Sequence, residues 1–241
     1  MQLTDFGVLS FDCYGTLIDW ETGLYAALQP LLQAAAPDLS RDGVLELFAK
    51  HESDQEVQTP GMIYSDLLAT VHRRLAQEFG VTLPDAAHRR FGASVPDWPA
   101  FPDSASSLQY LKKYYKLVIL SNVDRVSFAG SNKRLEVEFD AIYTAQDIGS
   151  YKPDLGNFRY LLDHLAADGI KPANLLHTAQ SLFHDHGPAK TLGLASAWID
   201  RRHDLGGWGA TMPVKGAGYD FRFTSMADMV KAHQADLRAC V

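Results

Sequence analysis

Five short apolar runs recur along the chain, each separated from the next by residues with helical spacing or by loops. They are rich in Val, Ile and Leu and span residues 7–12, 116–121, 141–144, 175–179 and 195–199. Runs that are apolar on both faces are typical of a parallel sheet that is covered by helices on both sides. The pattern therefore predicts an α/β fold whose core is a Rossmann-like, doubly wound parallel sheet.

A long insertion with helical patterning separates the first two runs. Apolar residues recur at helical spacing over 24–35, 43–57, 64–79 and 85–93, which is too much for a single crossover helix. The Pro-rich segment 96–102 follows and marks the return of the chain to the sheet. We therefore expect a core domain over residues 1–18 and 96–241, with an inserted α-helical cap domain over residues 19–95.

The composition is typical of a globular protein that binds a small molecule. Of the 241 residues, 46% are hydrophobic, which is enough for one full core and a second, smaller one. The formal charge of −7 argues against a nucleic acid or an anionic membrane as a partner. Cys13 and Cys240 indicate neither a disulfide framework nor a metal–thiolate site. Without a membrane-spanning stretch or a signal-peptide pattern, a cytoplasmic protein is expected, and the sequence leaves open whether it is a monomer or a homodimer.

Polar residues that could take part in catalysis or binding follow four of the predicted strands. Asp12 ends the first run, Ser121 and Asn122 end the second, Lys152 lies on the loop after the third, and the segment 180–185 follows the fourth. Ligands of open α/β sheets bind beyond the carboxyl ends of the strands, so these residues are expected to converge on one crevice.

Asp12 is the candidate nucleophile of this crevice. A carboxylate gains nucleophilic strength when fixed donors replace its hydration, and Gly15 and the hydroxyl of Thr16 lie nearby. The alternative is that Asp12 only caps a helix or a turn. Ser121 would donate to the substrate anion or to the nucleophile and Asn122 would hold its loop, although Ser-Asn is also a common turn signal.

Lys152 and Asp185 are the expected charged partners of Asp12. The Lys152 ammonium would let an acidic substrate approach Asp12 and would hold it, because two anions in contact repel strongly in a low-dielectric cleft. Asp185 would orient Lys152 or the hydrolytic water. The alternatives are a solvated surface lysine and an aspartate that caps the helix expected at 188–192.

Four ordered motifs resemble those of the haloacid dehalogenase superfamily. They read FDCYGTL at 11–17, LSN at 120–122, YKPD at 151–154 and QSLFHD at 180–185. With a helical insert after the first strand, the chain is most similar to the 2-haloacid dehalogenase branch, in which Tyr commonly replaces the second aspartate of the phosphatases. The resemblance implies a hydrolase in which Asp12 displaces halide from a short 2-halocarboxylate and yields a 2-hydroxy acid.

Two replacements favour dehalogenation over phosphate transfer. Gln180 stands where the phosphatases of this superfamily have a magnesium-binding aspartate, and Mg²⁺ prefers carboxylate ligands. Tyr14 stands where a phosphatase has its second acid, and a halide leaves without a proton. We therefore expect no metal and no cofactor. The alternatives are a Mg²⁺-dependent phosphatase and a non-catalytic binding protein on the same fold.

Other replacements leave the substrate open. Members of the dehalogenase branch clamp the substrate carboxylate with a cap arginine, and the best match to that position here is Ala49. Phe158 and Leu182 replace a tyrosine and an asparagine of the branch. Lys50, His51 or another residue of the cap is left as the candidate to receive the carboxylate.

Three aromatic residues are expected to wall the substrate pocket. They are Tyr14, Trp20 and Phe48, for which core packing is an equally good explanation. His184 and His186 flank Asp185, but residues one and two apart do not share a helical face, so we do not expect a metal there.

Overall fold

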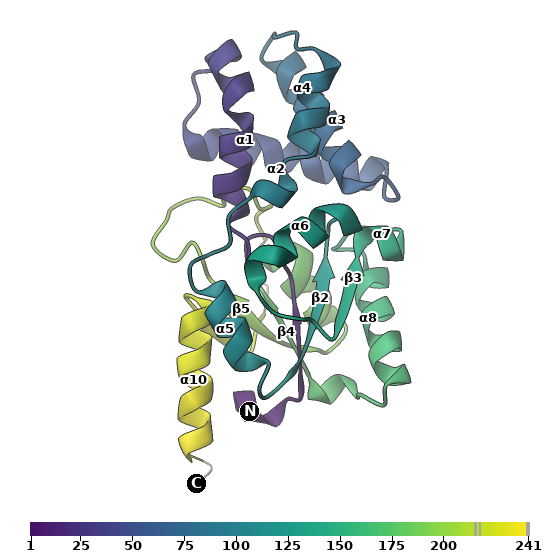
Figure 1. The fold of residues 1–241 in the computed structure, drawn as a ribbon, viewed down its shortest axis with the longest axis vertical. Helices are drawn as coiled ribbons and strands as arrows, with labels where there is room; N and C mark the ends of the chain where they lie inside the picture. The colour runs from purple at the N-terminus through teal and green to yellow at the C-terminus, as the bar shows by residue number, and fades with distance from the viewer. Residues whose placement is uncertain (215, 217, 240–241) are drawn as a thin grey trace.

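The core of the protein is a six-stranded, all-parallel sheet (Figure 1). The computed structural model describes residues 1–214, 216 and 218–239, so that Cys240 lies outside the described residues. The strand order is β3-β2-β1-β4-β5-β6. The strands are β1 (Val8–Phe11), β2 (Lys116–Ser121), β3 (Ala141–Thr144), β4 (Leu175–Ala179), β5 (Ala195–Ile199) and β6 (Phe221–Phe223). The predicted α/β class and all five predicted strands are confirmed, and β6 is an additional strand at the edge.

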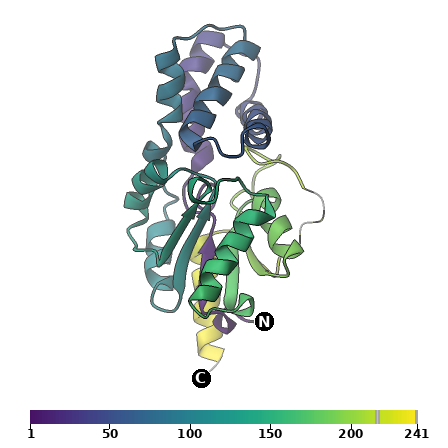
Figure 2. The same ribbon diagram turned by 90° about the vertical axis from the view of Figure 1, so that its right-hand side faces the viewer.

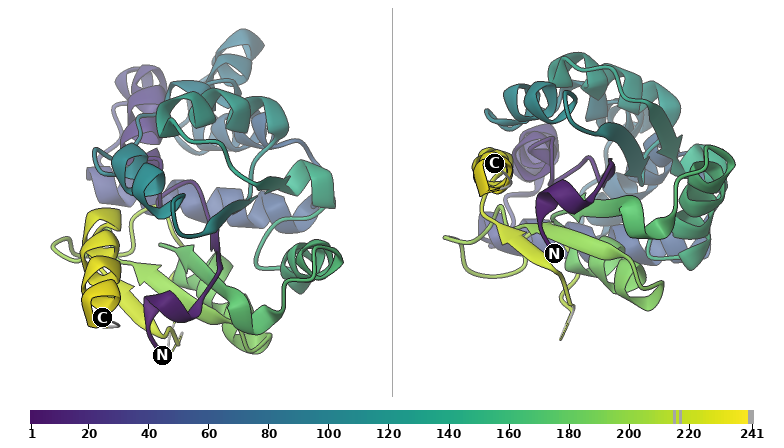
Figure 3. Two further views of the ribbon diagram at one scale, coloured as in Figure 1. Left: turned by 60° about the horizontal axis from the view of Figure 1, so that its bottom comes forward. Right: turned by 90° about the horizontal axis from the view of Figure 1, so that it is seen from below.

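Helices cover both faces of this sheet (Figure 3). Val8 of β1 packs in one apolar cluster with residues of α8 and α9, whereas Leu9 and Phe11 pack in the other, with residues of α5, α6 and α10. The covering helices are α5 (Ser104–Leu111), α6 (Arg125–Leu135), α7 (Ala145–Ile148), α8 (Leu155–Ala167), α9 (Gly187–Thr191) and α10 (Met226–Ala239). The central strands β1, β2 and β4 are buried on both faces, which explains why their runs are apolar without alternation. None of the described helices is long and apolar enough to cross a membrane.

Four helices between β1 and β2 form a separate layer beyond the carboxyl ends of the strands (Figures 1 and 2). They are α1 (Trp20–Ala35), α2 (Arg41–Gln58), α3 (Tyr64–Glu78) and α4 (Asp85–Gly92). The first two begin at capping side chains, since Asp19 accepts from the Thr22 amide at 3.2 Å and Ser40 from the Gly43 amide at 3.1 Å. The division into domains at residues 19 and 95 stays a prediction.

The two segments that join these helices to the sheet lie side by side. Ile18 forms isolated bridges with Tyr14 and with Ala100, and the Asp19 amide donates to the Pro99 carbonyl at 2.8 Å. Chain entry and chain return are therefore held together by backbone hydrogen bonds a few residues after Asp12 in the sequence.

A close approach at Gly23 fixes the position of α1 on the returning chain. A Cβ atom at Gly23 would lie 2.3 Å from Cγ of Trp98, which is itself fully buried. We expect Gly23→Ala to lower the free energy of unfolding by about 1–3 kcal/mol, because the indole cannot move away. Chemical denaturation measures the loss. Gly43→Ala is the matched control: a Cβ atom at this position in α2 would make only ordinary van der Waals contacts, the nearest at 3.5 Å from Ser40 Oγ, so the substitution should be neutral or stabilising.

Candidate active site

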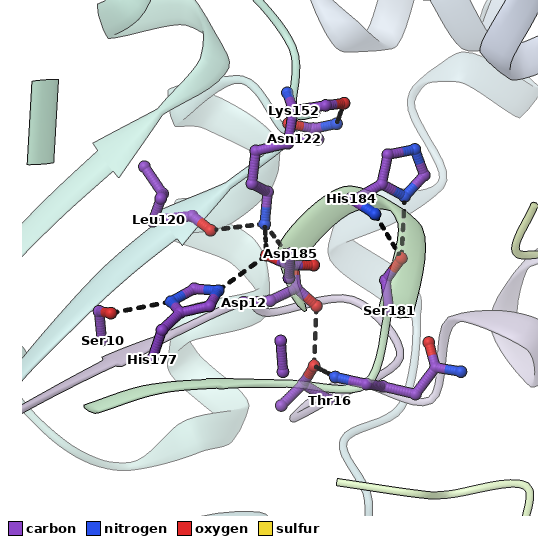
Figure 4. A network of polar contacts seen from close by, with 12 residues as sticks. Ser10, Asp12, Thr16, Leu120, Asn122, Lys152, His177, Ser181, His184 and Asp185 are labelled. Atoms are coloured by element: carbon purple, nitrogen blue, oxygen red, sulfur yellow. Dashed lines mark hydrogen bonds and ion pairs between the residues drawn. The ribbon is translucent and has the colours of Figure 1, made fainter. Parts of the chain in front are cut away.

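The carboxylate of Asp12 is fixed at both of its oxygens (Figure 4). Thr16 Oγ1 donates to Oδ2 at 2.8 Å, and Lys152 Nζ donates to Oδ1 at 3.0 Å. Thr16 Oγ1 also accepts from the Gln180 amide at 2.9 Å, which ties the turn after β1 to the end of β4. Asp12 follows β1 directly and caps no helix, so its side chain is available for a role in the crevice other than capping.

Lys152 is a buried cation and not a surface lysine. Its side chain is 2% exposed, and Nζ donates to Asp12 Oδ1, to Asp185 Oδ1 at 2.7 Å and to the Leu120 carbonyl at 2.9 Å. An ammonium has three hydrogens, and these bonds use all of them. Lys152 therefore supplies positive charge directly to Asp12, and the expectation that it also holds the substrate stays a prediction.

Asp185 connects Lys152 to a histidine that the sequence did not reveal. Its Oδ1 lies 2.9 Å from His177 Nε2, and His177 Nδ1 lies 2.8 Å from Ser10 Oγ. Asp185 sits in a single π-helical turn, Leu182–His186, so it does not cap the following helix. Although burial raises the pKa of Asp185, Lys152 and His177 together lower it well below its usual range. Asp185 is therefore ionised.

The charges of the Asp12–Lys152 pair also follow from their surroundings. Burial lowers the pKa of Lys152, but Asp12 and Asp185 raise it above its ordinary value on balance, so it is an ammonium. Burial raises the pKa of Asp12, against the effect of the nearby ammonium. A carboxylate with a raised pKa is more basic and hence a stronger nucleophile than an exposed one.

Asn122 holds the backbone on which Lys152 sits. Its Oδ1 accepts from the Lys152 amide at 2.7 Å and its Nδ2 donates to the Lys152 carbonyl at 2.9 Å. The neighbouring Ser121 is buried, and its hydroxyl has no hydrogen-bond partner among the described residues. A buried free hydroxyl at a cavity wall is available to a ligand.

These residues surround one small cavity of about 40 Å³. It is lined by Asp12, Tyr14, Trp20, Glu52, Glu56, Tyr64, Ser121, Asn122, Lys152, Gln180, Ser181, His184, Asp185 and Thr211. The structure thus brings Asp12, Ser121, Asn122, Lys152 and Asp185 together, with Thr16 behind Asp12.

Of the three predicted wall residues, two line the cavity. Tyr14 and Trp20 do so, and Tyr14 Oη is bonded to Ser131 Oγ at 3.0 Å. Phe48 does not. It is fully buried among the four helices, with its ring against those of Trp20 and Phe91. Its predicted contact with substrate is wrong, because core packing determines its place.

The helical layer contributes acids to the cavity where a cation was expected. Lys50 is exposed, and His51 binds Glu78 on the surface at 2.6 Å. Glu52 and Glu56, one helical turn apart on α2, line the cavity instead. Helical spacing in the sequence could have indicated these two acids, because they share one face of a helix with Leu45 and Phe48.

The residues present do not fit a magnesium ion. Gln180 contributes an amide, and its Oε1 lies 3.4 Å from the Thr211 hydroxyl. Asp185 Oδ1 is occupied by Lys152 and His177. Across the described residues, no three His, Cys, Asp or Glu side chains are placed to hold a metal together. His186 is turned to Ser196 Oγ and the Ala179 carbonyl.

The chain is similar to known hydrolases in sequence and in fold. A family model described as haloacid dehalogenase-like hydrolase matches residues 7–178. An L-2-haloacid dehalogenase, PA0810, is 22% identical, with a TM-score of 0.75 over 95% of this chain and 99% of its own. The L-2-haloacid dehalogenase of Xanthobacter autotrophicus with chloropropionic acid covalently bound is 15% identical, with a TM-score of 0.74 over 95% and 98%.

The same fold also occurs in a hydrolase with a bound metal ion. The HAD-hydrolase YfnB of Bacillus subtilis, bound to magnesium, is 15% identical, with a TM-score of 0.73 over 95% of this chain and 99% of its own. No curated protein matches the sequence. Likenesses at these identities show the fold and leave the substrate open. Because the family model spans most of the chain, from β1 through β4, the protein belongs to the haloacid dehalogenase-like hydrolases.

Proposed function

We propose that this hydrolase is a 2-haloacid dehalogenase with Asp12 as its nucleophile. One Asp12 oxygen attacks C2 of a short 2-halocarboxylate, the carbon–halogen bond breaks, and the halide leaves with the bonding electrons. Water then attacks the carbonyl carbon of the resulting aspartyl ester, which releases a 2-hydroxy acid and regenerates Asp12. The observation that carries this proposal is the Asp12 carboxylate at the cavity wall, held by Thr16 and Lys152.

The position of Tyr14 supports a leaving group that needs no proton. Burial raises the pKa of the Tyr14 phenol well above its usual range, and its hydroxyl is already bonded to Ser131. A phosphatase needs a second acid at this position to protonate an alkoxide, whereas a halide departs as a stable anion. The alternative of a Mg²⁺-dependent phosphatase is therefore less well supported, also because the donor set suits Mg²⁺ poorly.

Asp185 and Ser121 have the free atoms that the two steps require. Asp185 lines the same cavity, and its Oδ2 is buried and accepts no hydrogen bond from the described residues, so we assign this atom to the hydrolytic water. The free hydroxyl of Ser121 would donate to the substrate carboxylate or to the developing negative charge. Lys152 stabilises charge on Asp12 throughout, as a fixed and buried cation.

Halide release tests the proposal. The purified protein should release chloride from 2-chloropropionate. Activity that is confined to phosphate esters would support the phosphatase alternative, and inactivity on broad panels of both substrate classes would support the binding protein.

We expect the rate of halide release to be independent of metal ions. Addition of a chelator should leave it unchanged, and added Mg²⁺ should not raise it, because Gln180 replaces the anionic ligand. Steady-state rates before and after chelation provide the measurement. Loss of activity with chelator and its return with Mg²⁺ would contradict this expectation.

A further inference from the structure

The part of the cavity wall that α2 contributes is acidic, although the proposed substrate is an anion. Glu52 and Glu56 are 5% and 6% exposed, and both line the cavity that holds Asp12. Tyr64 Oη donates to Glu52 Oε1 at 2.6 Å, and Asn122 Nδ2 donates to Glu56 Oε1 at 3.1 Å. The second oxygen of each carboxyl receives no hydrogen bond from the described residues, so both can accept one from a ligand.

No cation of the cavity wall is available to balance these acids. Lys152 is the one Lys or Arg among the described lining residues, and its three hydrogens are already donated. His184 Nε2 is 3.7 Å from Glu56 Oε2, and burial lowers the pKa of His184 to about 4, so the ring is neutral near pH 7. Burial raises the pKa of Glu52 to about 7 and that of Glu56 well above its usual range. Both carboxyls therefore keep their protons to a higher pH than exposed carboxyls do, and a bound cation would favour their ionised forms.

Two buried atoms outside the acid pair are also available to a ligand. Ser121 Oγ and Asp185 Oδ2 belong to residues that are 2% and 0% exposed, and neither atom has a hydrogen-bond partner among the described residues. Both residues line the same cavity as Glu52 and Glu56. Buried polar atoms in native proteins are paired with protein groups or with ordered water, so these two atoms are available to a ligand or to the hydrolytic water.

The cation that fits this wall is organic and not a metal ion. Glu52 and Glu56 provide two carboxyls, and the described residues contain no cluster of three ligands for a metal. Trp20 and Tyr64 add aromatic rings to the wall, and such rings attract ammonium groups. Glu56 also borders a larger groove of about 410 Å³, so a ligand longer than a two-carbon acid has room.

We propose that Glu52 and Glu56 bind an ammonium group of the substrate, which makes the preferred substrate an amino-substituted 2-haloacid. This inference rests on the proposed dehalogenase function for the halide and the carboxylate. A zwitterion brings no net charge to a wall that already contains four carboxyl groups, whereas a simple 2-halocarboxylate adds an unbalanced anion to them.

Binding of two unreactive probes tests the subsite independently of catalysis. The probes are 3-aminopropionate and propionate, which share a carboxylate and differ in the ammonium group. Calorimetric titration of the wild-type protein should show about tenfold tighter binding of 3-aminopropionate. Glu56→Gln should reduce this preference to less than about twofold, since a neutral amide does not attract the cation. Glu46→Gln, an exposed residue of the same helix, is the matched control and should retain the preference.

The pH dependence of binding provides a second readout. The ammonium group favours the ionised carboxyls, so the affinity for 3-aminopropionate should rise as the pH increases through about 7. Glu52→Gln should flatten this rise. The other titratable groups that face the pair are Asp12, Tyr64, Tyr151, Lys152, His184 and Asp185, and they are present in both proteins.

The outcomes separate the subsite from the proposed function. Equal affinities for the two probes, no measurable binding of either, or an unchanged preference in Glu56→Gln would each overturn the ammonium subsite, whatever the halide assay shows. Halide release from 3-amino-2-chloropropionate should exceed that from 2-chloropropionate. If the binding preference is present and neither compound releases halide, the subsite stands and the dehalogenase proposal is wrong.

Discussion

Replacement of Asp12 by Asn is expected to abolish halide release while the fold is retained. The carboxamide can still accept from Thr16, but it cannot form the ester, and loss of a nucleophile removes the reaction path instead of weakening it. We expect a fall in turnover of about 10⁴-fold or more. Steady-state rates of freshly purified protein, checked for deamidation by mass spectrometry, provide the measurement.

The control for this substitution is Asp163→Asn, which removes an exposed carboxylate from α8. It should turn over at the wild-type rate. A deamidation-free Asp12→Asn protein with retained activity would show that another group carries the reaction.

Replacement of Lys152 by Met is expected to lower turnover by about two to three orders of magnitude. The buried ammonium is bonded to both Asp12 and Asp185, so its loss leaves two carboxylates near each other without a compensating charge. Unpaired buried charge also destabilises a protein, by about 3–5 kcal/mol in comparable cases. Rates should therefore be measured at a temperature where denaturation curves show the variant to be folded.

Lys152→Arg should not restore the rate, because a planar guanidinium cannot reproduce three bonds from one nitrogen to Asp12, Asp185 and the Leu120 carbonyl. Lys171→Met, at an exposed position, is the control for loss of a positive charge. If folded Lys152→Met keeps near-normal rates, the electrostatic role given to this lysine is wrong.

The sheet could be predicted because its central strands are buried on both faces. Each of the five predicted runs is long enough, and apolar enough, to stand out against the helices around it. β6 was missed because it has three residues, Phe221–Phe223, and its pairing with β5 is a tertiary event with no local signal. The four helices before β2 were predicted within a few residues, since their apolar spacing is regular.

The half of the site that lies on the sheet could also be predicted, because topology brings strand ends together. Asp12, Ser121 and Lys152 follow different strands and converge for that reason. His177 was missed because it lies inside a strand, where the sequence gives no sign that a histidine has a role beyond core packing. Its function as a partner of Asp185 depends on a register that only the folded sheet defines.

The part of the site that the helices contribute was predicted less well. Which of their residues reach the cavity depends on helix phase and on how the helices dock on the sheet. A search for a cation singled out Lys50 and His51, which lie on the outer face of α2. Helical phase would have favoured Glu52 and Glu56, on the same face as the buried Phe48. Their position against Asp12 follows from how α2 docks over the sheet, and no local pattern encodes that.

Covalent participation of Asp12 is measured most directly by a single turnover in oxygen-18 water. With protein in excess over the halogenated acid, water should label the carboxylate of the Asp12 peptide, and the hydroxy acid should carry the original, unlabelled Asp12 oxygen. Mass spectrometry of the digested protein and of the product reads both positions. Label in the hydroxy acid together with an unlabelled Asp12 peptide would show that water attacks the carbon directly, which contradicts the proposed mechanism.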